Sequence, residues 1–272
     1  MSETSGVVRI LGRDRWIVVV AMAAVVMVAA AYILAGGGTG MSALGMSAAT
    51  GPAGGLLGGA ADMVSPAVWT PGYAAVIFVM WWLMMVAMMV PSAAPAILLY
   101  GALNPTQGVR GMLAFLAGYL TIWAGMSLLA TGLQGALAAS GLISSMYMTL
   151  AVPWLGAVVL IGAGLYQLTP IKRACLDQCR GPVEALTRHR RSGPQAAFRM
   201  GLLHGRYCLG CCWGLMALLF VGGVMNLMWI LGLTLYVALE KLTPFGDRLA
   251  KPMGLGLIAL GLAVLIWPVG TG

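Results

Sequence analysis

Charged side chains are scarce in this 272-residue sequence: only 8% are Asp, Glu, Lys or Arg, whereas soluble domains carry about 25%. None occurs between Arg15 and Asp62, between Asp62 and Arg110, or between Arg110 and Lys172. With 61% hydrophobic residues and a mean hydropathy of +0.94, the chain has too little polar surface to coat a water-soluble fold. A soluble enzyme, a disordered chain and a coiled coil are therefore excluded. The sequence predicts an all-α, polytopic bundle of membrane-spanning helices.

Acidic residues are fewer than basic ones, and the formal net charge is +8. Membrane proteins concentrate Lys and Arg in cytoplasmic loops, where these side chains lie against anionic headgroups. We therefore expect the lipid bilayer as the partner of the basic residues, and no nucleic acid.

Seven apolar segments are predicted to span the membrane, since a span needs about 20 apolar residues. They cover about residues 16–35, 73–100, 111–135, 147–168, 200–222, 224–239 and 254–267. The first is interpreted as a retained anchor, because its apolar run exceeds the roughly 7–15 residues of a signal peptide. The predicted organisation is a cytoplasmic N-terminus with the first span (1–35), a Gly/Ala/Ser-rich extracytoplasmic linker (36–72), and a six-span domain (73–272) with a cytoplasmic loop (169–199).

Basic residues predict the orientation. With the N-terminus inside and the C-terminus outside, 14 of the 15 Lys and Arg residues fall in cytoplasmic segments and none falls outside. The remaining one, Arg206, lies within the fifth span. This bias is typical of a multi-pass protein of the inner (plasma) membrane.

The segment HGRYCLGCCWGLM, residues 204–216, carries the sharpest chemical signal. On a helix its five soft donors occupy an arc of about 140°; they are His204, Cys208, Cys211, Cys212 and Met216. Gly201 and Gly205 share this face in a G-x-x-x-G spacing that lets another helix approach closely, whereas Arg206 lies on the opposite side. Imidazole, thiolate and thioether together favour Cu(I), or zinc, over Mg²⁺ or Ca²⁺.

A second cysteine motif, TPIKRACLDQCRGP, occupies residues 169–182. On a helix, Cys175 and Cys179 would share one face, and the nearby Lys172, Arg173 and Arg180 would favour the thiolate form. Two thiolates at this spacing suit a soft-metal clamp or a redox pair. No cysteine lies in a predicted outside segment, so structural disulfides are not expected.

Methionine is abundant, with 20 residues, and five of them fall in the second span. Met84, Met85, Met88 and Met89, together with Met80, cover about half of that helix. Thioethers bind Cu(I) without the desolvation penalty of a carboxylate, although methionine is also an ordinary packing residue. Pro91 and Pro95 follow and should kink or break the helix, with the Ser92 hydroxyl satisfying a freed carbonyl.

Polar residues also mark the sixth span. Asn226 is placed to cap its outer end, and Glu240 with Lys241 is expected to form an ion pair at its cytoplasmic end. The sequence contains no P-loop, no H-E-x-x-H and no G-x-S-x-G motif. Nor does it contain paired acids within the spans. A proton relay of carboxylates therefore has no obvious place.

Four blocks of this sequence resemble a bacterial family. They are WWLMMVAMMVPSAAP (81–95), TPIKRACLDQCRGP, HGRYCLGCCWGLM, and the later segment GVMN with the dipeptide EK that follows it. The family is known as domain of unknown function 2182, described as predicted metal-binding integral membrane proteins, and the resemblance covers about residues 73–268. It implies a multispan membrane protein with inferred metal binding and no secure reaction. The positions that it carries over are Met84, Met85, Met88, Met89, Pro91, Ser92, Cys175, Cys179, Cys208, Cys211, Cys212, Trp213, Asn226, Glu240 and Lys241.

Three hypotheses for the function follow. The first is a non-enzymatic Cu(I) carrier or assembly factor, in which the methionines face the Cys/His arc and Cys175 with Cys179 exchanges metal with a metal chaperone or a metalloprotein partner. The second is a membrane thiol-redox protein that passes electrons between the Cys175/Cys179 pair and the Cys208 cluster, where Cys208 and Cys211 form a Cys-x-x-Cys motif. The third is a structural subunit with incidental cysteines.

Overall fold

The computed structural model describes residues 2–37, 42–50, 69–144, 148–181, 193–243 and 245–266. This part of the chain contains α-helices, one 3-10 turn at Pro105–Gln107 and no strand. The helices are α1 (Ser2–Leu34), α2 (Ala43–Thr50), α3 (Pro71–Leu103), α4 (Gly108–Ala139), α5 (Pro153–Gln167), α6 (Pro170–Arg180), α8 (Pro194–Ala217), α9 (Leu219–Gly222), α10 (Leu227–Leu242) and α11 (Gly246–Ile266). The predicted all-α class is confirmed.

Five segments are long and apolar enough to cross a membrane. They are Trp16–Leu34, Pro71–Leu103, Pro105–Ala139, Pro194–Gly222 and Arg248–Ile266. The pair α5 and α6, bent by 64°, would make a sixth. At 16 residues, α10 is about 24 Å long, shorter than the roughly 30 Å of hydrocarbon core. The expected seventh span is therefore not supported by length, and the N-in, C-out orientation stays a prediction.

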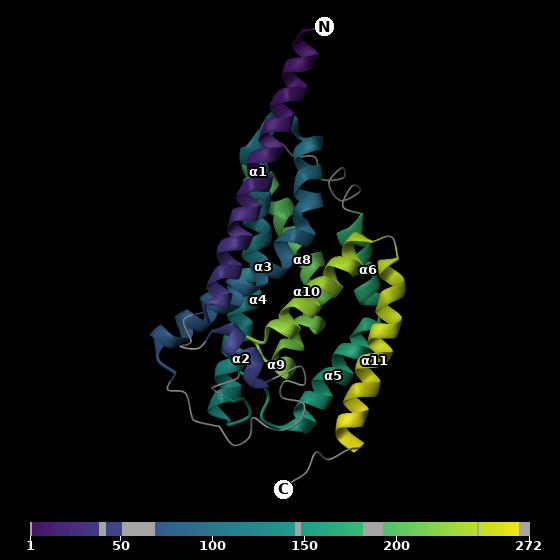
Figure 1. Ribbon diagram of the computed structural model, residues 1–272. Coiled ribbons are helices and arrows are strands. Elements are labelled where there is room, and N and C mark those ends of the chain that lie inside the picture. The colour runs from purple at the N-terminus through teal and green to yellow at the C-terminus, as the bar shows by residue number, and fades with distance from the viewer. Residues whose placement is uncertain are drawn as a thin grey trace.

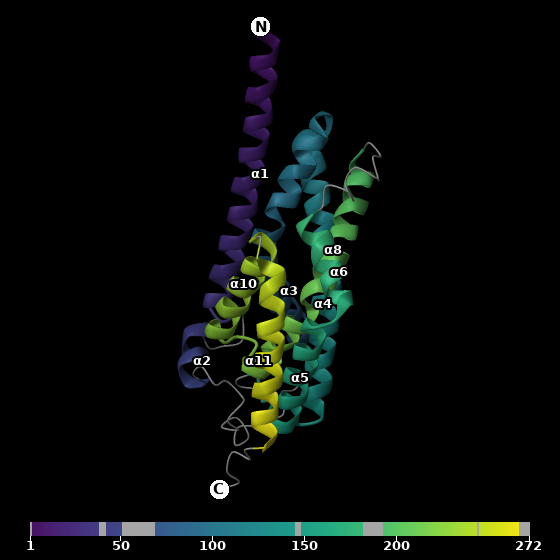
Figure 2. The same cartoon turned by 90° about the vertical axis from the view of Figure 1, so that its right-hand side faces the viewer.

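The long helices run side by side in a bundle (Figure 1). The turn between α3 and α4 lies at one end (Figures 1 and 2), and α2 and α9 lie toward the other (Figure 1). The most extensive contacts join α4 to α8, α5 to α11, α3 to α4 and α1 to α3. The bundle thus brings α3, α4 and α8 together, and α10 contacts both α3 and α8.

Small residues let α4 and α8 touch closely. A Cβ atom at Gly201 would collide with the backbone carbonyl of Phe115, and one at Gly118 with that of Phe198. Gly205 faces the side chain of Ile122. The expected role of the G-x-x-x-G pair is confirmed, since substituents at these positions would separate the two backbones.

Helices lie within both segments that were predicted to be a linker and a loop. The predicted linker contains α2, and the predicted loop 169–199 contains α6, whose Thr169 cap accepts a hydrogen bond from the Lys172 amide. Pro91 and Pro95, which were expected to kink or break the helix, do not break α3, since it continues to Leu103. The rest of the linker (51–68) and of the loop (182–192) lies outside the described residues.

Candidate metal centre

The sequence-predicted arc on α8 is buried. His204 is 7% exposed, and Cys208, Cys211, Cys212 and Met216 are each 1% exposed. Arg206, on the opposite side, is exposed, as predicted. Gly201 and Gly205 on the same face allow α4 to cover the arc, so these soft donors point into the bundle.

Cys208 is the best-connected of these residues. Its Sγ lies 2.9 Å from Lys241 Nζ and 3.0 Å from the hydroxyl oxygen of Tyr119. The same Nζ lies 3.5 Å from Ser92 Oγ and 3.9 Å from Met89 Sδ. Side chains of α3, α4, α8 and α10 therefore converge on one sulfur atom.

A thioether approaches the cysteines from α3. Met89 Sδ lies 4.0 Å from Cys212 Sγ, and Met89 is fully buried. Met84, Met85 and Met88 are buried too, at 0–2% exposure. Of these four predicted ligands, only Met89 has a hydrogen-bond contact with a cysteine sulfur among the described residues.

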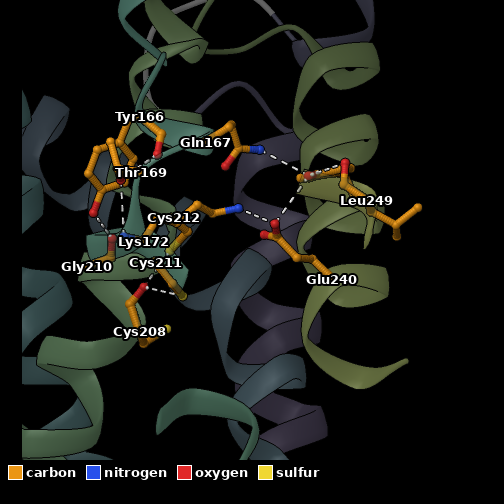
Figure 3. A network of polar contacts seen from close by, with 11 residues as sticks. Tyr166, Gln167, Thr169, Lys172, Cys208, Gly210, Cys211, Cys212, Glu240 and Leu249 are labelled. Carbon is orange, nitrogen blue, oxygen red and sulfur yellow. Dashed lines mark hydrogen bonds and ion pairs between the residues drawn. The ribbon is translucent and has the colours of Figure 1, made fainter. Parts of the chain in front are cut away.

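All five cysteines are free thiols. Cys211 and Cys212 donate to the backbone carbonyl of Cys208, at 3.1 and 2.8 Å (Figure 3). These bonds satisfy two thiols within the helix while keeping their sulfur atoms in the interior.

The second cysteine motif joins the same region. On α6 the side chain of Cys179 interacts with those of Cys208 and Cys211. Cys175, which is half-buried, packs with its sulfur against Gly210 of α8. The two cysteines were expected to lie in a cytoplasmic loop; instead, α6 packs along α8, which places Cys179 beside the arc and Cys175 against Gly210.

The basic neighbours of that motif do not lie where the sequence suggested. Lys172 is buried and forms an ion pair with Glu240, and the Arg180 guanidinium donates to the Thr243 carbonyl at 2.6 Å. The cation beside the buried thiols is Lys241, from α10.

Glu240 and Lys241 do not form the expected ion pair with each other. Adjacent residues on a helix point about 100° apart, so Glu240 reaches Lys172 on α6 (Figure 3) while Lys241 reaches Cys208 on α8. Both side chains are buried, at 0% and 8% exposure. The expected Asn226 cap is confirmed, because its side chain accepts from the Met228 amide at 3.0 Å.

Aromatic residues complete the surroundings. The His204 ring centroid lies 5.8 Å from those of both Phe115 and Tyr119. The Tyr119 hydroxyl lies 3.2 Å from the Met89 carbonyl, which also accepts from Ser92 at 2.9 Å. The Ser92 hydroxyl therefore donates to the Met89 carbonyl, three residues earlier in the chain. It was expected to donate to a carbonyl that loses its backbone donor because of a proline. The sequence analysis did not predict that Tyr119 and Lys241 contact Cys208. The available signal was that each is a polar group in or beside an apolar run.

In the part of the chain that the structure describes, no three His, Cys, Asp or Glu side chains are arranged to hold a metal ion. What is present is a buried set of sulfur atoms from three helices, with one imidazole and one ammonium group. Soft donors of this kind are ligands of copper and other soft metals, whereas hard cations such as Ca²⁺ prefer six or more oxygen ligands.

Fold and site thus define a helical membrane protein with a buried sulfur-rich centre. A protein-family model named PpoB2, described as "Copper chaperone", matches residues 78–264, and the chain belongs to this family. No curated protein and no solved structure matches. The match supports copper and gives no support to zinc. The resemblance to the family called domain of unknown function 2182 stays a prediction.

Proposed function

We propose that this protein binds Cu(I) at its buried sulfur centre and delivers it to a partner. The observation that carries the proposal is the approach of Met89 to Cys212 at 4.0 Å, next to Cys208. Thiolate and thioether sulfur from separate helices would give Cu(I) the soft ligands and the low coordination number that it accepts.

Cys208, Cys212 and Met89 are the proposed primary ligands, with Cys211, Cys179 and His204 adjoining them. Lys241 lies where a cation is favoured, next to one thiol and one thioether. When copper is bound to two thiolates, the complex carries a net negative charge. A buried ammonium group then compensates that charge in surroundings where an unpaired charge is expensive.

Delivery rather than transport is proposed because sulfur atoms extend from the interior toward the surface. Cys175 is only half-buried and packs against α8 at Gly210, whereas Cys179 reaches Cys208 and Cys211. Exchange of Cu(I) between neighbouring thiols needs no free ion. Cys175 and Cys179 are the proposed route by which a metal chaperone or an acceptor metalloprotein exchanges copper with the centre.

The test is Cu(I) binding to the purified full chain, measured against a chromophoric Cu(I) chelator under reducing conditions. The Cys208→Ser/Cys211→Ser/Cys212→Ser variant should lose binding, whereas Cys175→Ser should keep the stoichiometry and transfer copper more slowly to an acceptor. Full retention of Cu(I) by the triple variant refutes the proposal. Circular dichroism checks that both variants keep their helices.

A thiol oxidoreductase remains the second candidate, since Cys179, Cys208 and Cys211 interact. Thiol–disulfide exchange requires a partner to reach the attacked sulfur, and Cys208 and Cys211 are each only 1% exposed. Burial therefore favours copper. The two functions are separated by exposing the protein to an oxidant, alkylating the thiols that stay reduced, and analysing the product by mass spectrometry. A disulfide between any two of these cysteines supports the redox role.

A further inference from the structure

A crevice lies where α5 gives way to α6. The two helices meet at a 64° bend around Leu168 and Thr169. Beside that bend is a cavity of about 190 Å³, whose opposite wall is formed by α11. The crevice is separate from the sulfur centre, and no step of the copper proposal uses it.

Basic residues dominate its polar lining. Lys172, Arg173 and Lys251 all line the cavity, and among the described residues no acidic side chain does. Lys172 is already paired with Glu240, whereas Arg173 and Lys251 are exposed. The N-terminus of α6, an 11-residue helix, opens onto the same space. The positive end of a helix dipole favours an anion.

A buried polar atom in this lining also lacks a partner. Gln167 is 4% exposed, and its Nε2 donates to the Tyr236 hydroxyl at 3.0 Å (Figure 3). Its Oε1 is buried and accepts no hydrogen bond from the part of the chain that the structure describes. A buried acceptor without a donor is destabilising, so this atom indicates a ligand that carries a hydroxyl or amine donor.

Apolar residues provide the remaining walls. Leu176 is buried, whereas Leu168 and Leu255 are 42% and 60% exposed at the rim. The crevice thus combines two exposed cations, one acceptor and a hydrophobic rim. Basic pockets between membrane helices are typical binding places for anionic headgroups.

We propose that this crevice binds a phosphate ester whose phosphate pairs with Arg173 and Lys251 and whose hydroxyl group donates to Gln167. Guanidinium and ammonium groups form charge-assisted hydrogen bonds with phosphate oxygen atoms. The phosphate belongs either to an anionic lipid headgroup or to a small soluble phosphate. Phosphatidylglycerol carries both chemical features and is the probe for the first source.

The test is native mass spectrometry of the full chain in nonionic detergent, titrated with phosphatidylglycerol or phosphatidylcholine. Phosphatidylcholine has the same phosphate but no hydroxyl donor. We expect phosphatidylglycerol to bind at least tenfold more tightly. The Arg173→Gln/Lys251→Gln variant should lose about tenfold in affinity, because it removes charged hydrogen bonds.

The matched control is Arg110→Gln/Arg199→Gln, which removes the same charge at exposed positions outside the crevice. It should change affinity less than twofold. Equal losses in the two double variants, or equal binding of the two lipids, overturn the proposal. Displacement of the lipid by millimolar inorganic phosphate assigns the site to a small phosphate, and no displacement assigns it to the lipid.

Discussion

Lys241 donates to Cys208 across 2.9 Å in the interior of the bundle, with no carboxylate as its partner in this contact. A buried ammonium group needs a compensating negative charge, and its sequence neighbour Glu240 is paired with Lys172 instead. An ionisable residue buried among membrane helices is, by default, a hypothesis for a functional site. We therefore treat Lys241 as the counter-charge of the sulfur centre.

Lys241→Gln should lower Cu(I) affinity by at least tenfold. The substitution removes the charge that balances a copper–dithiolate complex and adds no sulfur ligand. Chelator competition measures the affinity, and Arg110→Gln, at an exposed arginine, is the control. Unchanged or tighter binding by Lys241→Gln contradicts this role.

Met89→Leu should weaken Cu(I) binding about tenfold with little loss of stability. Exchange between Met and Leu conserves volume, but it removes the thioether that lies 4.0 Å from Cys212. Met88→Leu is the matched control, since Met88 is equally buried. A comparable loss in both variants would mean that methionine packing, and not the Met89 sulfur, determines the affinity.

Gly201→Ala should destabilise the protein by about 1–3 kcal/mol or more, because its Cβ atom would collide with the Phe115 carbonyl. Separating α4 from α8 should also weaken Cu(I) binding. Gly132→Ala, where a Cβ meets open space, is the control. Thermal unfolding in detergent measures the stability of the two variants. Equal melting temperatures for Gly201→Ala and Gly132→Ala would argue against the close α4–α8 contact.

Lys172→Met should destabilise the fold by about 3–5 kcal/mol, because it leaves Glu240 buried without its partner. The Lys172→Met/Glu240→Met variant should recover most of that loss. Denaturant unfolding of the two single variants and the double variant gives the coupling energy. Additive losses would show that the pair does not interact energetically.

Much of the fold follows from local sequence. Apolar length predicts α1, α3, α4 and α11, and helical periodicity predicts that Cys208 is buried while Arg206 is exposed. Residues 170–180 were assigned to a loop because their charges lower the hydropathy. That segment is an amphipathic helix, α6, which buries Leu176 and Lys172 against its neighbours.

The assembly of the centre is less predictable. The arc on α8 follows from spacing within one helix, but the partners of Lys241 and Glu240 depend on how α6, α8 and α10 pack. Sequence adjacency suggested an interfacial ion pair, whereas the fold separates the two side chains toward different helices. Tyr119 likewise reaches Cys208 only because glycines bring α4 against α8.

The most direct test of the copper account is X-ray absorption spectroscopy at the copper edge on the metal-loaded full chain. We predict Cu(I) with a first shell dominated by sulfur, and one fewer sulfur scatterer in Met89→Leu. A shell of oxygen ligands, or a sulfur shell that survives in Cys208→Ser/Cys211→Ser/Cys212→Ser, would contradict a buried thiolate–thioether centre.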